Sequence, residues 1–203
     1  MEIKIIVVVV ALGVLAFSLN TLFDWISIKR NTKAKPFVTI TFFGLQGLAL
    51  FLSIWTSVRF SLPVGLSILG WLLLPISIVL LSYSLTIGIS LGKNYSRSGV
   101  SNHLVKTGNY ALIRHPDLIW YVTFLIALIL VSSSATLLIV APIWAAWKLI
   151  CVIIQDKVLF VRMIPGYRQY KQETPMIIPN RKSLIAFWRT IKIDIHRSEK
   201  IVV

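Results

Sequence analysis

The sequence predicts an all-α polytopic integral membrane protein with about five transmembrane helices, the last two forming a C-terminal helical hairpin. Hydrophobic residues make up 57% of the 203 residues and charged residues only 14%, and the mean hydropathy is +0.82. These values lie outside the usual range of soluble domains. The apolar residues are gathered into uncharged blocks of about the 20 residues that a bilayer requires. The basic residues lie mainly between those blocks.

The first three spans are predicted from uncharged blocks in the first half of the chain. Residues 5–23 form the first block, which we interpret as a retained helix because no signal-peptide cleavage site directly follows its apolar core. Residues 37–58 form the second. The third block is longer than one untilted span needs, so we interpret 60–66 as an interfacial approach and about 67–90 as the span. Pro75 predicts a kink in it.

A helical hairpin is predicted from the uncharged residues 118–147. The sequence "VSSSA" at 131–135 interrupts this block, and a turn there would create two arms. The first arm begins near Pro116 and is short, so four spans remain an alternative to five. The second arm continues beyond the membrane as an amphipathic helix towards Arg162.

The distribution of basic residues favours the five-span arrangement. Two loops and the C-terminal segment are rich in Lys and Arg, whereas the segment at 59–63 carries only Arg59 and the serine turn carries none. The positive-inside rule then predicts an N-terminus outside and a cytoplasmic C-terminus. Four spans would put the second basic loop and the tail on opposite sides. The basic residues of the two loops are Lys29, Arg30, Lys33, Lys35, Lys93, Arg97, Lys106 and Arg114.

The chain divides into transmembrane helices at 1–91, a core at 92–180 and a basic cytoplasmic tail at 181–203. Pro175 and Pro179 stop helix propagation before the tail. The tail mixes aromatic and basic residues. It is either an interfacial helix on an anionic membrane surface or a mostly disordered segment.

Several functional classes are excluded by composition. The net charge is +14, but no basic face with interleaved aromatic residues forms a module, so no nucleic-acid partner is expected. The single cysteine, Cys151, excludes an intramolecular disulfide and a cysteine-based zinc site. The three histidines lie too far apart in the sequence to predict a metal site, and His196 is interpreted as a solvated tail residue. Neither a phosphate loop nor a nucleophile elbow is present.

The stretch "GNYALIRHP" at 108–116 is the first candidate for chemistry. Gly108 permits a tight turn, Tyr110 offers a flat face and a hydroxyl, and Arg114 and His115 lie at the membrane boundary. Pro116 and Asp117 suit the first turn of a helix. From spacing alone, this is either a helix start with a snorkelling arginine or a functional site.

The second candidate is "CVIIQDKVLFVRMIPGYRQY" at 151–170. Gln155 and Asp156 come where the apolar helix leaves the membrane, and Tyr167 and Tyr170 lie three residues apart. On its own, this segment is typical of an ordinary amphipathic exit helix.

Together the two segments resemble the signatures of the isoprenylcysteine carboxyl methyltransferase and phospholipid methyltransferase family of integral-membrane enzymes. The first signature reads roughly Leu-Val-x-x-Gly-x-Tyr-x-x-x-Arg-His-Pro-x-Tyr, and "LVKTGNYALIRHP" follows it. In the second, Gln155-Asp156 stand in place of a Glu pair and Leu159 matches. Tyr167 and Tyr170 then match in register. The resemblance covers roughly residues 80–180.

The resemblance implies a methyltransferase-like core that binds S-adenosylmethionine in a pocket at the cytoplasmic face, with a lipid-like acceptor entering from the bilayer. Methyl transfer from a sulfonium needs close in-line approach, and aromatic faces suit its positive charge. The candidate catalytic residues are Arg114 and Asp156. The candidate substrate contacts are Cys151, Trp120 and Tyr121. The implied cofactor contacts are Asn102, His103, Leu104, Val105, Gly108, Tyr110, His115, Pro116, Asp117, Leu118 and Gln155.

The sequence departs from the family pattern at several positions, and Met163-Ile164 replace a Phe-Gly pair in the second signature. Leu118 replaces a Tyr and Trp120 a small residue, while Gln155 replaces a Glu. Cys151 stands where the prenylcysteine enzymes carry an Arg for the substrate carboxylate. Two alternatives therefore stay open, a non-catalytic membrane protein on a degenerate methyltransferase fold and a related membrane reductase that uses NADPH.

Overall fold

The computed structural model describes residues 2–28, 33–88 and 104–199 of the chain. These residues are helical apart from short connections and one isolated bridge between Arg59 and Ser134. The expected all-α class is therefore confirmed for the described part of the chain.

Helices α1 (Glu2–Ile28), α2 (Ala34–Trp55) and α3 (Val64–Gly88) correspond to the three predicted N-terminal spans. Helix α1 continues beyond the predicted block of residues 5–23 to Ile28, and so places the Asp24 carboxylate inside a long apolar helix. Pro75 lies within α3. In such helices the backbone satisfies its own hydrogen bonds, which is the requirement that a bilayer imposes.

The predicted hairpin is formed by α6 (Pro116–Ser132) and α7 (Ala135–Ile154). Its turn is at the expected position, with Ser133 in the left-handed region at φ 52°. The Ser134 hydroxyl accepts from the backbone N–H of Leu137 at 2.9 Å and so caps α7. Arg59 donates to the carbonyl of Ser132, which ties the α2–α3 connection to the turn.

The second arm continues beyond α7 as expected, but through a π-helix. This segment, η1 (Gln155–Leu159), leads into α8 (Phe160–Met163) and, after Gly166 at φ 79°, into α9 (Tyr167–Glu173). The tail forms α10 (Arg181–Glu199), which agrees with the helical interpretation of residues 181–199.

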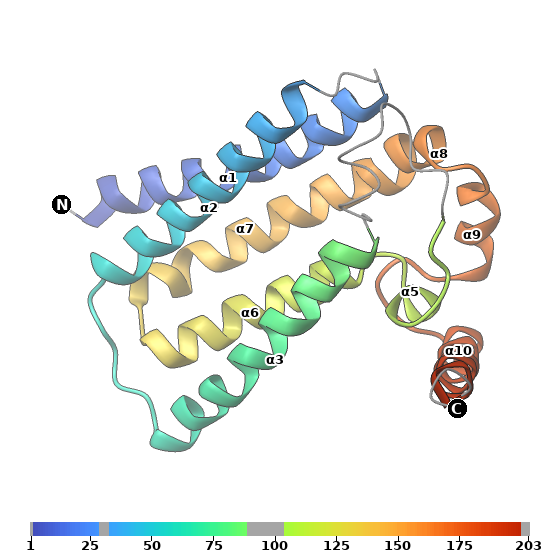
Figure 1. Ribbon diagram of the computed structural model, residues 1–203. Coiled ribbons are helices and arrows are strands. Elements are labelled where there is room, and N and C mark those ends of the chain that lie inside the picture. Colours follow the sequence, from blue (N-terminus) through green and yellow to red (C-terminus); the bar gives the residue numbers. More distant parts are fainter. Residues whose placement is uncertain (1, 29–32, 89–103, 200–203) are drawn as a thin grey trace.

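The bundle consists of α1, α2, α3, α6 and α7, with the N-terminus and α10 at opposite ends (Figure 1). Four of these helices are long and apolar enough to cross a membrane, and α6 is a shorter apolar helix of 17 residues. The core lies between α1, α2, α6 and α7 around the fully buried Trp144. Large apolar side chains on α2 and α3, such as Phe51 and Trp71, are exposed and suit contact with lipid.

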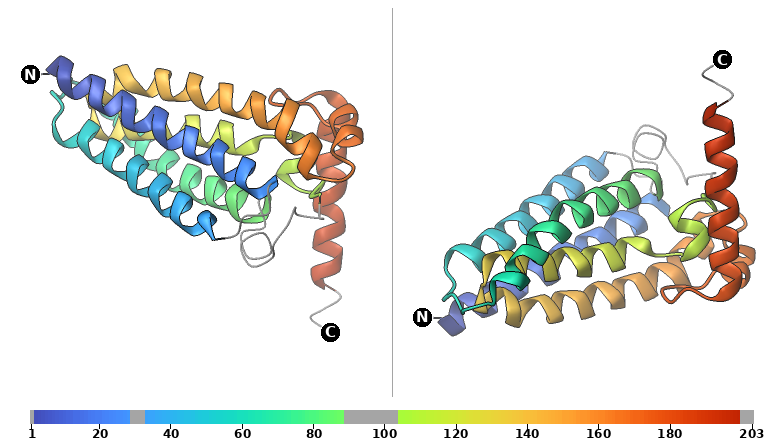
Figure 2. Two further views of the ribbon diagram at one scale, coloured as in Figure 1. Left: turned by 90° about the horizontal axis from the view of Figure 1, so that it is seen from above. Right: turned by 90° about the horizontal axis from the view of Figure 1, so that it is seen from below.

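One end of the bundle gathers the elements that carry the candidate chemistry. The C-terminal ends of α1 and α7 lie there together with the start of α6, and α8, α9 and the short α5 (Asn109–Leu112) cover them (Figure 1). Helix α10 crosses this end with its axis roughly perpendicular to the bundle helices (Figure 2).

Candidate functional site

Most of the predicted cofactor residues lie at this end of the bundle, on the segment from Leu104 to Leu118. Leu104, Val105 and Tyr110 are half-buried, and His115 and Leu118 are buried. Asn102 and His103 lie outside the described residues. The structure therefore brings the first signature into one compact segment at the start of α6.

The segment turns at Gly108, whose backbone has φ 58° and ψ −134°. This conformation is nearly restricted to glycine, and it allows α5 to begin directly afterwards. The Tyr110 hydroxyl then donates to the carbonyl of Ser84 at 2.7 Å, and the Tyr170 hydroxyl donates to the carbonyl of Tyr110 at 2.5 Å. Burial raises the pKa of both phenols above the ordinary value, so both stay protonated.

The two signatures meet through a two-point ion pair between Arg114 and Asp156. The Arg114 Nε lies 2.8 Å from Asp156 Oδ1, and its Nη2 lies 3.1 Å from Oδ2. The remaining guanidinium nitrogen donates to the carbonyls of Lys171 and Thr174. Arg114 is 9% exposed, so the snorkelling interpretation of this side chain is wrong. Its side-chain nitrogens donate to Asp156 on η1 and to the carbonyls of Lys171 and Thr174 on α9 and its end.

Asp156 receives three further groups besides Arg114. The Tyr167 hydroxyl donates to Oδ1 at 2.8 Å, and the Lys171 ammonium lies 2.9 Å from Oδ2. His115 Nε2 lies 3.4 Å from Oδ1. We call Arg114, His115, Asp156, Tyr167 and Lys171 the exit-helix cluster.

Aromatic rings flank the exit-helix cluster. The His115 imidazole stacks on Phe160 with a centroid separation of 5.7 Å and an angle of 12°. Tyr167 meets Phe160 edge-on at 5.5 Å and Tyr170 at 5.7 Å. Flat, electron-rich faces of this kind are suited to an organic cation.

The π-helix η1 carries both Gln155 and Asp156. Both are buried, and their side chains contact different parts of the fold. Asp156 meets Arg114, but Gln155 Nε2 donates to Asp24 Oδ2 of α1 at 2.7 Å. The predicted cofactor residue Gln155 therefore has α1 as its partner.

A second charged cluster, missed by sequence reasoning, lies beside the first. The Lys148 ammonium is 2.8 Å from Asp117 Oδ2, and it lies over the rings of Phe17 at 5.2 Å and Tyr121 at 5.5 Å. We call Asp24, Asp117, Lys148 and Gln155 the bundle cluster. The signal that was available is a single lysine in the last part of an apolar helix, since charges inside such helices are rarely incidental.

Two of the three predicted substrate residues lie in the apolar core, and the third, Trp120, lies next to Tyr121 in the sequence of α6. Cys151 and Tyr121 belong to the apolar core, where the Cys151 thiol lies 3.7 Å from the carbonyl of Phe17 and Tyr121 accepts from Gln46 Nε2 at 3.0 Å. Trp120 is half-buried, and its indole N–H has no hydrogen-bond partner within the described residues.

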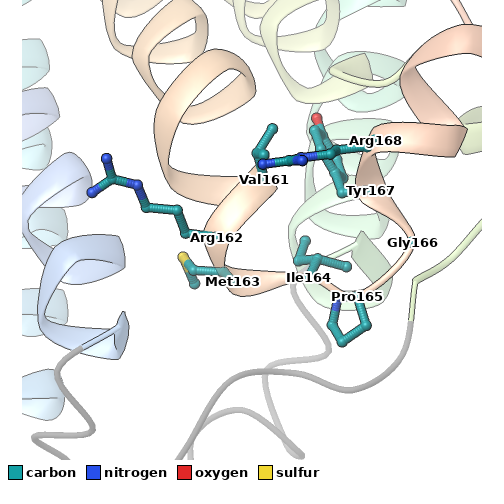
Figure 3. Close-up of a pocket in the computed structure, with 8 residues that line it drawn as sticks. All are labelled: Val161, Arg162, Met163, Ile164, Pro165, Gly166, Tyr167 and Arg168. Atoms are coloured by element: carbon teal, nitrogen blue, oxygen red, sulfur yellow. The ribbon is translucent and has the colours of Figure 1, made fainter.

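A pocket of about 330 Å³ lies at the turn between α8 and α9 (Figure 3). It is lined by residues 161–168 and contains none of the predicted cofactor residues. It shares only Tyr167 with the exit-helix cluster. In Figure 3, Arg162 extends to the opposite side of the pocket from Tyr167.

The described residues contain no group of three His, Cys, Asp or Glu side chains that would hold a metal ion. Among the described residues, the aromatic ring of Phe160 stacks on His115, and the buried indole N–H of Trp120 has no hydrogen-bond partner. Comparison of the chain with family models, curated proteins and solved structures gives no match.

Proposed function

We propose that the chain is an integral-membrane methyltransferase that uses S-adenosylmethionine and acts on an amphiphilic or lipid-like acceptor. The observation that carries the proposal is direct contact between the two signatures: Arg114 of the first pairs with Asp156 of the second. The hairpin brings the start of α6 beside the end of α7, and the support comes from the specific pairing there, since one charged residue of each signature joins the other in a buried two-point ion pair.

The residues near this contact suit such a cofactor. The aromatic rings of His115, Phe160 and Tyr167 beside the ion pair are of the kind that favours a sulfonium, and the buried indole N–H of Trp120 has no partner among the described residues. When bound, the cofactor supplies an electrophilic methyl group. The protein then has to hold the acceptor in line with it and exclude water, which needs rigid positioning more than proton transfer.

Arg114 and Asp156 fit a positioning role in this chemistry. Each already has its charge neutralised and its hydrogen-bonding positions largely filled by protein groups, so neither is poised to exchange a proton. Their pairing fixes the start of α6 against the end of α7. A lipid-like acceptor is supported by the position of this contact, at the end of an apolar bundle.

The arrangement that goes with this function has five spans, an external N-terminus and a site on the cytoplasmic side. The short α6 would be accommodated by packing between α3 and α7, since a span of about 17 residues is at the lower limit for a bilayer. The basic segments support the orientation.

The direct test is calorimetric titration of the purified full chain with S-adenosylmethionine and with S-adenosylhomocysteine. We expect saturable binding to both. His115→Ala and Tyr110→Ala should weaken it, and His196→Ala, in the tail, should leave it unchanged. Absence of binding at physiological cofactor concentrations, or an equal loss in all three variants, would refute the proposal.

A second candidate, a non-catalytic protein on a degenerate methyltransferase fold, is favoured by one observation. Gln155, which stands at the position of a family glutamate, is held by Asp24 instead. The sharpest test exchanges the two groups, because Asp24→Asn with Gln155→Glu keeps a carboxylate–amide pair and avoids two adjacent carboxylates. If wild type fails to bind cofactor and the exchanged variant binds it, the degenerate fold is the correct assignment.

A further inference from the structure

Helix α10 has a geometry that the candidate site does not explain. Its axis is roughly perpendicular to the five bundle helices, and its C-terminal part extends past the edge of the bundle (Figure 2). If the bundle spans a bilayer, α10 runs parallel to the membrane plane at the level where the spans end. This is the orientation of an interfacial helix.

One side of α10 is fixed to the protein. Ser183, Phe187 and Thr190 recur at the spacing of one helical face, and they are buried or half-buried. The Thr190 hydroxyl accepts from the backbone N–H of Gly108 at 3.2 Å, at the turn that precedes α5. The helix is thereby attached to the segment that carries the first signature.

A different side of α10 carries large apolar side chains without cover. Leu184, Ile185 and Trp188 are 44%, 54% and 61% exposed. At about 100° per residue they occupy a sector well away from the packed face. An exposed apolar cluster on a helix whose other face is packed on the protein is typical of an interaction surface.

The charges next to this apolar surface select its partner. Arg181, Lys182 and Arg189 are all exposed, and no acidic residue occurs between 181 and 190. An aromatic and aliphatic surface bordered by basic side chains is complementary to an anionic bilayer, where the apolar groups enter the interface and the cations meet lipid headgroups.

We infer that α10 lies on the anionic surface of the membrane that the bundle spans, with Leu184, Ile185 and Trp188 inserted and the opposite face holding the Gly108 turn. The lipid surface then helps to hold α10 in place, and α10 in turn holds the Gly108 turn of the first signature. The inference does not depend on the proposed methyltransferase activity.

Spin-label depth measurements on the full chain in nanodiscs test this inference. In a Cys151→Ser background, a label at Leu184→Cys reports the apolar side. The matched control is Ala186→Cys, which is also exposed but lies on the far side of the helix. Each is measured in phosphatidylcholine alone and in phosphatidylcholine with phosphatidylglycerol.

We expect the ratio of oxygen accessibility to nickel-complex accessibility at position 184 to rise several-fold when phosphatidylglycerol is present, and to change little at position 186. Replacing Arg181, Lys182 and Arg189 by Gln should remove this dependence, since each basic side chain near an anionic surface contributes about fivefold in partitioning.

Equal nickel-complex accessibility at both positions in both lipids would overturn the inference. So would a label at 184 shielded from both reagents, which would indicate a protein partner. Neither readout involves the cofactor.

Discussion

Asp156 shows why single residues at this site have large consequences. The carboxylate is 2% exposed, and burial in such a place is tolerable only because Arg114, Tyr167 and Lys171 all donate to it. The pairing of buried charges is weak as a source of net stability, but removal of one partner leaves the other without compensation. The cluster is therefore sensitive to loss of any one charge.

We expect Asp156→Asn to destabilise the fold by about 3–5 kcal/mol, because the buried Arg114 would lose its counter-ion. Thermal unfolding of the detergent-solubilised protein measures this change. The matched control is Glu173→Gln, which breaks an exposed pair with Lys106 at 3.0 Å and should leave the unfolding midpoint almost unchanged. Equal effects of the two substitutions would contradict the role given to Asp156.

The phenols of Tyr110, Tyr167 and Tyr170 predict a loss of stability at high pH. Burial raises the pKa of all three, and the carboxylate of Asp156 adds to the effect on Tyr167. The folded state therefore retains protons that the unfolded chain releases above the ordinary phenol pKa of about 10, so stability is fully present below that pH and falls above it. Unfolding midpoints measured across this range should decrease, and Tyr167→Phe should reduce the slope. An identical slope in the variant would disprove the assignment.

Some side-chain contacts at the site could be predicted from the sequence and others could not. The resemblance implied that the loop, the start of the hairpin and the exit helix lie together, and the structure brings His115 within 3.4 Å of the Tyr167 hydroxyl. The bond between Gln155 and Asp24 was not predicted, because it joins residues 131 apart and no local pattern links them. The same holds for Lys148 and Asp117, which meet only because the hairpin turn brings α6 beside α7.

At the scale of elements, the turn before α5 depends on Gly108. An added Cβ would lie 3.1 Å from the Tyr83 hydroxyl, and the backbone has φ 58°. We expect Gly108→Ala to cost about 1–3 kcal/mol through backbone strain and to weaken cofactor binding through displacement of Tyr110. The control is Gly44→Ala in α2, where nothing lies within 4 Å of the added carbon. Unchanged stability and binding in Gly108→Ala would show that the turn tolerates a side chain.

The contact between α1 and α7 depends on Gly13, which packs directly against the indole ring of Trp144. Trp144 is fully buried and cannot move aside easily. We expect Gly13→Ala to destabilise the bundle by about 1–3 kcal/mol through overpacking. Gly47→Ala, which has open space around it, should change the unfolding free energy by less than about 0.5 kcal/mol. A neutral Gly13→Ala would indicate that α1 is not held at this distance from α7.

Some elements were predictable and others were not, for physical reasons. Uncharged blocks of residues predicted the bundle helices. The position of the hairpin turn was predicted from the serines that interrupt the apolar run at 131–135. The π-helix at Gln155–Leu159 was not predictable, since it arises where two buried side chains have partners on different elements. The sequence did not decide between a helical and a disordered tail. Its mixture of aromatic and basic residues fits both, and no other segment of the sequence is marked as the surface on which α10 would pack.

At the scale of the whole molecule, the basic residues are concentrated at one end of the helical bundle. The α2–α3 connection and the hairpin turn lie at the end of the bundle that contains the N-terminus, and α8, α9 and α10 lie at the other end (Figure 1). The second end is the basic one, with Arg162, Arg168 and Lys171 among its residues. Such an asymmetry is what sets orientation during insertion.

The orientation leads to a prediction for the intact cell. Val58 in the α2–α3 connection is 61% exposed, and Arg168 on α9 is exposed at the other end. In a Cys151→Ser background, a membrane-impermeant maleimide should label Val58→Cys on intact cells, but should label Arg168→Cys only after permeabilisation. The two positions serve as controls for each other, because an inverted protein would exchange their behaviour and a mixed population would label both. Exchange would contradict the cytoplasmic assignment of the site, and with it the access of a cytoplasmic cofactor to Arg114 and Asp156, whereas the contacts between the helices would be unaffected.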